Sequence, residues 1–240
     1  MTSTTSRISF EKSGYYFVGL LVLAFLGFWN KYFSRFFTDH NADYSFYFHF
    51  HAVMMILWVI LLIAQPLLIQ KKKIELHRRI GKITYFLMPV LLFSVVLVLN
   101  SGLKSMPENE VTLASILAPF RDLLLLSVAF SIGIYYRRNV QIHARAMIIT
   151  GLVFIEPALS RFLGGMLFKG MGMVGPLLTI LIILGMITTL IIMERKQKSA
   201  RWLFPSLLVV YTISYLIMIF EIPLTFFDPF VKWFAALPLT

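Results

Sequence analysis

Seven apolar stretches, each long enough to cross a lipid bilayer, constrain this chain more than any other feature. A membrane-spanning helix needs about 20 mostly apolar residues, and lipid cannot satisfy an open backbone. The alternating segments of about ten residues that are typical of a membrane β-barrel do not occur. We therefore predict an all-α polytopic membrane helix bundle with seven transmembrane helices. The stretches are Tyr15–Phe33, Phe46–Ile69, Ile80–Asn100, Leu113–Tyr136, Ala144–Leu167, Val174–Met193 and Trp202–Phe220.

The composition supports a membrane protein and excludes several other classes. The chain is 59% hydrophobic and only 14% charged, whereas an ordinary globular domain carries about 25% charged residues. So few charges cannot cover the surface of a soluble enzyme of this length, and the apolar content excludes disorder, a collagen-like rod and a coiled coil. The absence of cysteine excludes disulfides, thiolate metal sites and cysteine nucleophiles.

The charged residues of the loops predict how the bundle is oriented. Alternate connections hold 15 basic residues and three acidic ones, and such loops usually face the cytoplasm. We therefore expect the N-terminus inside and the C-terminus outside. The basic face would contact anionic lipids, and nucleic acid is not an expected partner. The basic residues are Arg7, Lys12, Lys71, Lys72, Lys73, Arg78, Arg79, Lys82, Arg137, Arg138, Arg145, Arg195, Lys196, Lys198 and Arg201.

The same pattern divides the chain into three parts. Residues 1–14 form a cytoplasmic segment, and residues 15–222 form the seven-helix transmembrane domain. Residues 223–240 form an outer interfacial segment, in which the aromatic stretch 228–237 predicts a short helix at the membrane surface. We read the first apolar stretch as a retained helix because no small-residue cleavage site follows it.

Four charged residues fall inside the predicted spans, where charge is costly and marks function by default. They are Arg121, Asp122, Glu156 and Arg161. The directions of the two spans place all four in the outer half of the membrane. Cross-pairing of Arg121 with Glu156 and of Asp122 with Arg161 would neutralise them. This cluster is either a structural ion-pair network or the polar wall of a ligand or ion cavity, and Pro157 beside it frees a backbone carbonyl.

Two further polar residues lie on one face of the second span. His51 shares this face with Met54, Met55, Trp58 and Gln65, which suits a stripe that faces the bundle. Ordinary packing, with His51 bonded to a neighbouring carbonyl, is the alternative. His49 points about 200° away from His51 on a helix, so the two cannot serve one site without distortion. His40 is expected to be a solvated residue of the outer loop.

Two histidines sit on the predicted inner side, each at the start of a helix. His77 and His143 could lie at one depth and hold a haem iron, or hold a metal ion with a third ligand. Alternatively, each imidazole bonds lipid phosphates or caps loop carbonyls.

Several of these residues together resemble an uncharacterised bacterial family of small multi-pass membrane proteins. The resemblance covers residues 25 to about 165. It implies a bacterial cytoplasmic membrane protein and supports the choice of polar residues, but it supplies no reaction. The residues that carry it are Phe28-Trp29, Tyr32-Phe33, Phe48-His49-Phe50-His51, Trp58, Gln65-Pro66, His77-Arg78, Gly81, His143, Arg145, Met147 and Arg161.

A weaker resemblance connects the chain to the b-type cytochrome transmembrane reductases. It rests on His51 followed by Met54, Met55 and Trp58, then a basic loop and His77. Those proteins hold two haems with four histidines on four helices. Here His77 and His143 could ligate one inner haem, whereas an outer haem lacks a second ligand.

These observations rank the functions. A polar ligand- or ion-binding site in the outer half of the bundle, transport-like or sensor-like, comes first. Membrane redox with haem comes second, and a metal-dependent membrane enzyme using His49, His51, Asp122 and Glu156 comes third. A structural or assembly role is the fourth, because glycines 164, 165, 170, 172 and 175 could permit close helix contact. The preferred interpretation of this run is a flexible outer loop, given the nearby Pro176. A homo-oligomer is a further expected partner. No phosphate-binding loop, nucleophile elbow or HExxH motif occurs.

Overall fold

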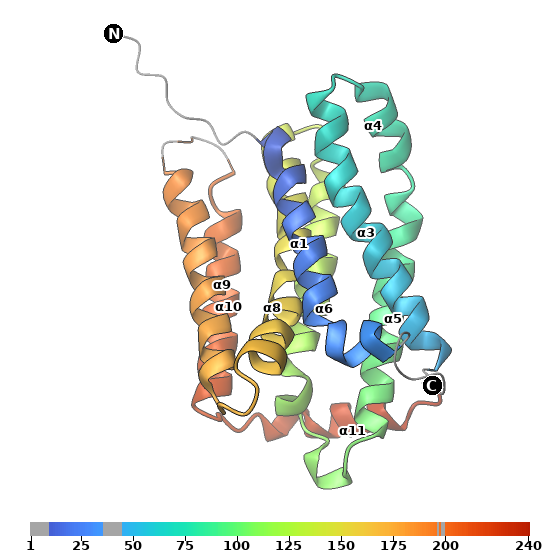
Figure 1. Cartoon of the computed structure of the whole chain (residues 1–240), viewed down its shortest axis with the longest axis vertical. Coiled ribbons are helices and arrows are strands. Elements are labelled where there is room, and N and C mark those ends of the chain that lie inside the picture. Colours follow the sequence, from blue (N-terminus) through green and yellow to red (C-terminus); the bar gives the residue numbers. More distant parts are fainter. Residues whose placement is uncertain (1–9, 36–44, 196, 198–199) are drawn as a thin grey trace.

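The computed structural model describes residues 10–35, 45–195, 197 and 200–240 as a helical bundle without strands (Figure 1). Arg7, Asp39, His40, Asp43, Lys196 and Lys198 lie outside the described residues. The helices are α1 (Ser13–Gly27), α3 (Phe46–Gln70), α4 (Ile74–Gly81), α5 (Thr84–Lys104), α6 (Leu113–Tyr135), α7 (Val140–Leu152), α8 (Ile155–Phe162), α9 (Val174–Met193), α10 (Leu203–Ile219) and α11 (Asp228–Ala236). Short 3-10 or π segments are η1 (Phe10–Lys12), η2 (Trp29–Phe33), η3 (Glu108–Glu110), η4 (Leu163–Leu167) and η5 (Thr225–Phe227).

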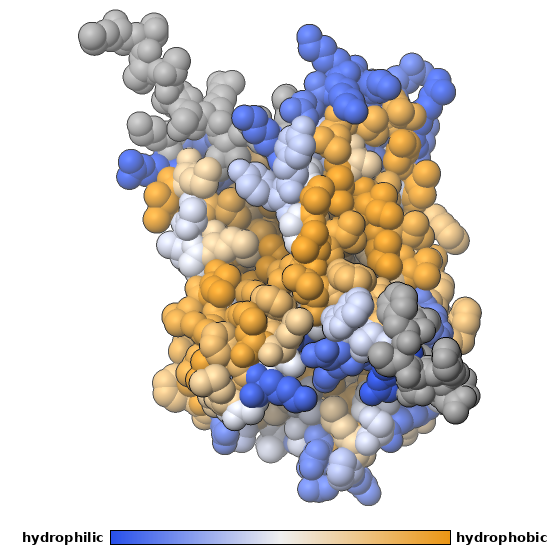
Figure 2. Space-filling model, in the orientation of Figure 1, coloured by the Kyte–Doolittle hydropathy of each residue, from blue (hydrophilic) through white to orange (hydrophobic). Residues whose placement is uncertain are grey.

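Five helical segments of the described chain are long and apolar enough to cross a membrane. Four are single helices, and the fifth is the 28-residue unit 140–167 formed by α7, α8 and η4. Two shorter apolar helices, α1 and α10, run beside them (Figure 1). Figure 2 shows a broad apolar band between hydrophilic ends, as expected of a multi-pass membrane protein. The count of seven spans and their sidedness stay predictions.

Three of the expected continuous spans are interrupted. The third, Ile80–Asn100, contains a turn at Lys82 and Ile83 between α4 and α5. The other two interruptions border the cavity described below. The first span ends as an α-helix at Gly27 and continues as the π segment η2. The fifth span breaks at Val153 and Phe154. Pro157 explains this break because it has no N–H to donate to the carbonyl of Val153, four residues earlier. Wide π turns are frequently found at functional sites.

The interior of the bundle is dominated by one large apolar cluster drawn from most of the helices, and a smaller cluster lies beneath α11. The fully buried side chains of the large cluster include Trp58, Met88, Leu91, Phe204 and Tyr211. Many large apolar side chains point away from this cluster and are exposed. In water these surfaces would cost free energy, whereas lipid tails accept them.

The C-terminal segment packs across one end of the bundle, at the opposite end from α4 (Figure 1). The predicted short helix is confirmed as α11. The side chain of Asp228 accepts a hydrogen bond from the backbone N–H of Leu113 at 3.0 Å. Asn100 donates to the carbonyl of Phe234 at 2.8 Å, and Val231 is fully buried against α5 and α6. These bonds fix α11 to the ends of both helices.

The glycine-rich stretch that follows α8 combines a turn with a close helix contact. Gly170 and Gly172 adopt positive φ values of 84° and 57°, a conformation that glycine adopts at no steric cost. Gly175 at the start of α9 packs directly against the backbone of Gly164, leaving no room for a Cβ atom. The run therefore joins η4 closely to α9 within one chain.

Replacing Gly27 by alanine should destabilise the protein, because α1 and α8 touch at this point. A Cβ atom on Gly27 would clash with the backbone carbonyl of Ala158. Overpacking of this kind costs about 1–3 kcal/mol, measurable by SDS titration of the purified protein followed by circular dichroism. Gly19 lies on the same helix with nothing within 4 Å of an added Cβ, so Gly19→Ala is the matched control. Equal stability of the two variants would contradict the close contact.

Candidate ligand-binding site

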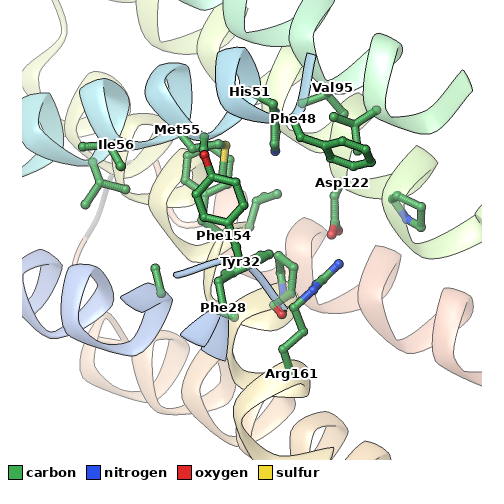
Figure 3. Close-up of a pocket in the computed structure, with 18 of the residues that line it drawn as sticks. Phe28, Tyr32, Phe48, His51, Met55, Ile56, Val95, Asp122, Phe154 and Arg161 are labelled. Atoms are coloured by element: carbon green, nitrogen blue, oxygen red, sulfur yellow. Dashed lines mark hydrogen bonds between the residues drawn. The ribbon is translucent and has the colours of Figure 1, made fainter. Parts of the chain in front are cut away.

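A cavity of about 430 Å³ lies between α1, η2, α3, α5, α6 and the segment from Val153 to α8. Its size falls in the range of about 300–1,000 Å³ that is usual for small-molecule sites. Most of its lining is aliphatic or aromatic. Five lining residues carry polar or charged side chains: Lys31, Tyr32, His51, Asp122 and Arg161. Figure 3 shows Tyr32, His51, Asp122 and Arg161 around a common space.

Arg161 lines the cavity without an acidic partner in the described chain. Its Nη1 donates to the carbonyl of Pro157 at 2.8 Å, and its guanidinium carbon lies 4.7 Å from the centre of the Phe28 ring. The predicted pairing of Asp122 with Arg161 is wrong, since no such ion pair forms. The physical reason is that Asp122 bonds to its own neighbour, Arg121.

The predicted pairing of Arg121 with Glu156 is present and belongs to a larger network. Nη2 of Arg121 bonds to Glu156 and, at 2.8 Å, to Oδ1 of Asp122, which also accepts from Nε at 3.0 Å. Nη1 donates to Ser214 on α10 at 2.9 Å, and the guanidinium lies 4.3 Å from the centre of the Tyr211 ring. Arg121 is 5% exposed, so this network is a buried bridge between α6, α8 and α10. Asp122 is its one member that lines the cavity.

His51 faces the cavity from α3 with a defined tautomer. Its Nδ1 lies 3.0 Å from Oγ of Ser94, and that hydroxyl donates its hydrogen to the carbonyl of Leu91 at 2.6 Å. Because a serine hydroxyl has one hydrogen, Ser94 must accept from Nδ1–H, and Nε2 is then an acceptor. His49 contacts a different group, with Nδ1 2.7 Å from the hydroxyl of Tyr32, in agreement with the expected divergence of the two rings.

Gln65 does not belong to this site. It lies near the α4 end of the bundle and is absent from the cavity lining. In the orientation that satisfies its amide, it donates to Nδ1 and to the carbonyl of His77 and accepts from the N–H of Gly81 at 3.1 Å. Gln65 follows His51 by fourteen residues on the same helix, which places the two residues about 21 Å apart.

His77 and His143 also lie outside the cavity lining. Burial lowers the pKa of His77 below the ordinary histidine value, so the ring is neutral at pH 7. Because Gln65 donates to Nδ1, the proton of this neutral ring lies on Nε2, and neither nitrogen offers a lone pair to an iron. Nδ1 of His143 lies 2.8 Å from the carbonyl of Gly133. The bonds made by His77 therefore do not fit haem ligation.

The described residues contain no group of three or more histidine, aspartate or glutamate side chains arranged to hold a metal ion. In particular, His49, His51, Asp122 and Glu156 do not converge: His49 bonds to Tyr32, His51 bonds to Ser94, and the two carboxylates share Arg121.

A second buried ion pair, at the α4 end of the bundle, does not follow from the sequence pattern. Arg145 is completely buried, and its Nε donates to Glu194 at 2.6 Å. Nη1 donates to the backbone and side-chain oxygens of Gln141, both at 2.8 Å, and Nη2 donates to Gln197 at 3.0 Å. The ring of Phe10 covers the guanidinium at 4.9 Å. The one available signal was Glu194 as an isolated acid in a strongly basic loop.

Comparison of the chain with protein-family models, with curated proteins and with solved structures finds no match.

Proposed function

We propose that this chain is a multi-pass membrane protein that binds a small molecule in the outer half of its helix bundle, in a transport-like or sensor-like role. The site is the 430 Å³ cavity lined by His51, Asp122 and Arg161. The observation that carries the proposal is the position of Arg161, which is a charged group in an otherwise mostly apolar cavity with no acidic partner in the described chain. Charged groups within membranes face cavities or pathways far more often than lipid.

The surroundings of the cavity support binding better than a purely structural role. In a structural network the charged groups would be expected to bond to one another, as Arg121 does with Asp122 and Glu156. Arg161 instead bonds a carbonyl of its own helix and packs on an aromatic ring. The π segment η2 and the broken span at Phe154 both contribute to the lining. The apolar walls suit an organic molecule better than a bare ion, which would require several convergent oxygen ligands.

Filling the cavity should abolish binding without unfolding the protein. Ala52 lines the cavity, whereas its neighbour Val53 is 50% exposed on the outside of the same helix. We expect organic extracts of purified wild-type and Val53→Trp protein to contain the same stoichiometric small molecule by mass spectrometry. Ala52→Trp should lose it because the indole occupies its volume. Identical extracts from all three folded proteins would contradict a cavity-bound ligand.

A further inference from the structure

We propose that the ligand of this cavity is an aliphatic monocarboxylate, with its carboxylate on Arg161 and its chain along the apolar wall. This inference rests on the proposed function and adds the chemical class of the molecule. Three features of the site carry it: the composition of the wall, the unused donors of Arg161, and the hydrogen bonds that Asp122 already accepts from Arg121.

The wall of the cavity is suited to a hydrocarbon body. Apart from its five polar residues, the lining is aliphatic or aromatic and comes from six segments of the chain. Figure 3 shows Phe28, Phe48, Met55, Ile56, Val95 and Phe154 around the space that Arg161 enters. Methionine and aromatic side chains adapt well to flexible apolar ligands. An alkyl chain makes favourable contacts along such a wall, whereas a sugar or a nucleotide would leave its polar groups without partners.

The head of the ligand is indicated by the guanidinium of Arg161. Arginine has five N–H donors, and Nη1 makes the single hydrogen bond that Arg161 forms within the described chain. The ring of Phe28 covers one face of the guanidinium, and such stacking limits the orientations that the group can adopt. Its remaining donors form a planar fork, which a carboxylate matches with two parallel hydrogen bonds.

The hydrogen bonds of the charged lining residues favour an anionic head over a cationic one. Asp122 already accepts two hydrogen bonds from Arg121, whereas Arg161 donates to no carboxylate of the described chain. A bound carboxylate would therefore be the acidic partner of Arg161, a role that Asp122 does not fill.

The test uses a photoreactive dodecanoate with a diazirine in mid-chain and the full-length protein in phosphatidylcholine nanodiscs. After illumination, labelled peptides are mapped by mass spectrometry. We expect labelling at cavity-lining positions of α1, α3 and α5. Unlabelled dodecanoate should compete at these positions about 10- to 100-fold better than dodecanol or dodecyltrimethylammonium, because a charge-assisted bond is lost with the other heads.

Variants of the arginine supply an independent measure of the same contact. Arg161→Gln should weaken competition by dodecanoate about 10- to 100-fold. Arg161→Lys should weaken it by a smaller, intermediate factor, because lysine keeps the charge but not the planar fork. Lys232→Gln is the control, since Lys232 is exposed on α11 and does not line the cavity. The comparison of heads on the wild-type protein needs no variant, so it decides the question even if Arg161→Gln does not fold.

The possible results separate this inference from the proposed function. If labelling maps to the cavity but the three heads compete equally, or the cationic head competes best, the monocarboxylate is wrong and a binding cavity stands. If Ala52→Trp leaves all labelling unchanged and the labelled peptides lie only on lipid-facing surfaces, the cavity does not bind this probe, and the monocarboxylate is again wrong. If organic extracts of wild-type, Val53→Trp and Ala52→Trp protein also agree, the proposed function fails as well.

Discussion

Replacing Arg145 by leucine should destabilise the protein by about 3–5 kcal/mol, because it leaves Glu194 buried without its partner. Arg145 is completely buried and Glu194 is 3% exposed. The variant also removes the donors that hold Gln141 and Gln197, so the ends of α7 and α9 lose their connection. The measurement is the free energy of unfolding from SDS titration in mixed micelles, followed by far-ultraviolet circular dichroism.

An exposed ion pair of the same chain is the matched control for this experiment. Arg79 and Glu75 are paired on α4 with side chains that are 73% and 80% exposed. Arg79→Leu should change stability by no more than about 0.5 kcal/mol, because solvent screens such pairs. The double variant Arg145→Leu, Glu194→Leu should recover part of the loss, since no charge is then left unpaired. A loss in Arg145→Leu as small as that in Arg79→Leu would show that the buried pair is not structural.

Replacing Arg121 by leucine is the second substitution from which we expect a large effect, again about 3–5 kcal/mol. This arginine joins Asp122, Glu156 and Ser214, and its loss leaves two neighbouring carboxylates without a cation. The stacking of the guanidinium on Tyr211 is lost as well. The same SDS titration measures the effect.

Comparison with other substitutions distinguishes the network from a general effect of lost charge. Arg121→Lys keeps the charge but not the planar fork, so we expect an intermediate loss of about 1–3 kcal/mol. Arg138→Leu removes an arginine that is exposed between α6 and α7, and its stability should stay close to wild type. If Arg121→Leu is as stable as Arg138→Leu, the ion pairs do not hold the three helices together.

The helices themselves could be predicted from the sequence because lipid imposes a simple rule on long apolar stretches. Each of the seven predicted stretches corresponds to helical structure. The two interruptions beside the cavity could not be placed by hydropathy alone, since both lie within stretches that are long and mostly apolar. Pro157 accounts for the second break, but Pro66, Pro89 and Pro119 lie within continuous helices. A proline therefore permits a break, and the packing around it decides whether one forms.

The site was predicted in part, and helix geometry explains what was missed. Arg121 and Glu156 pair as expected because they lie at similar depths on neighbouring helices. Arg161 follows Glu156 by five residues, which is about 140° around a helix, so the two cannot face the same neighbour. The contribution of Tyr32 and Lys31 depends on η2, whose wide turns have no hydropathy signal. The burial of Arg145 has no hydropathy signal either. The isolated acid Glu194 indicates a buried partner, but at a separation of 49 residues it does not show which arginine it pairs with.

The break between α7 and α8 also decides how the cavity wall that carries Arg161 is held in place. α8 has only eight residues and is followed by the π segment η4, so few regular helical bonds connect it to the rest of its span. Arg161 projects from this short helix, and Ala158 of the same helix packs on Gly27 of α1. α8 is therefore held in place mainly by other helices, through the ion pair of Glu156 with Arg121 on α6 and the contact of Ala158 with α1. The position of Arg161 in the cavity wall depends on these contacts more than on the helix that precedes it.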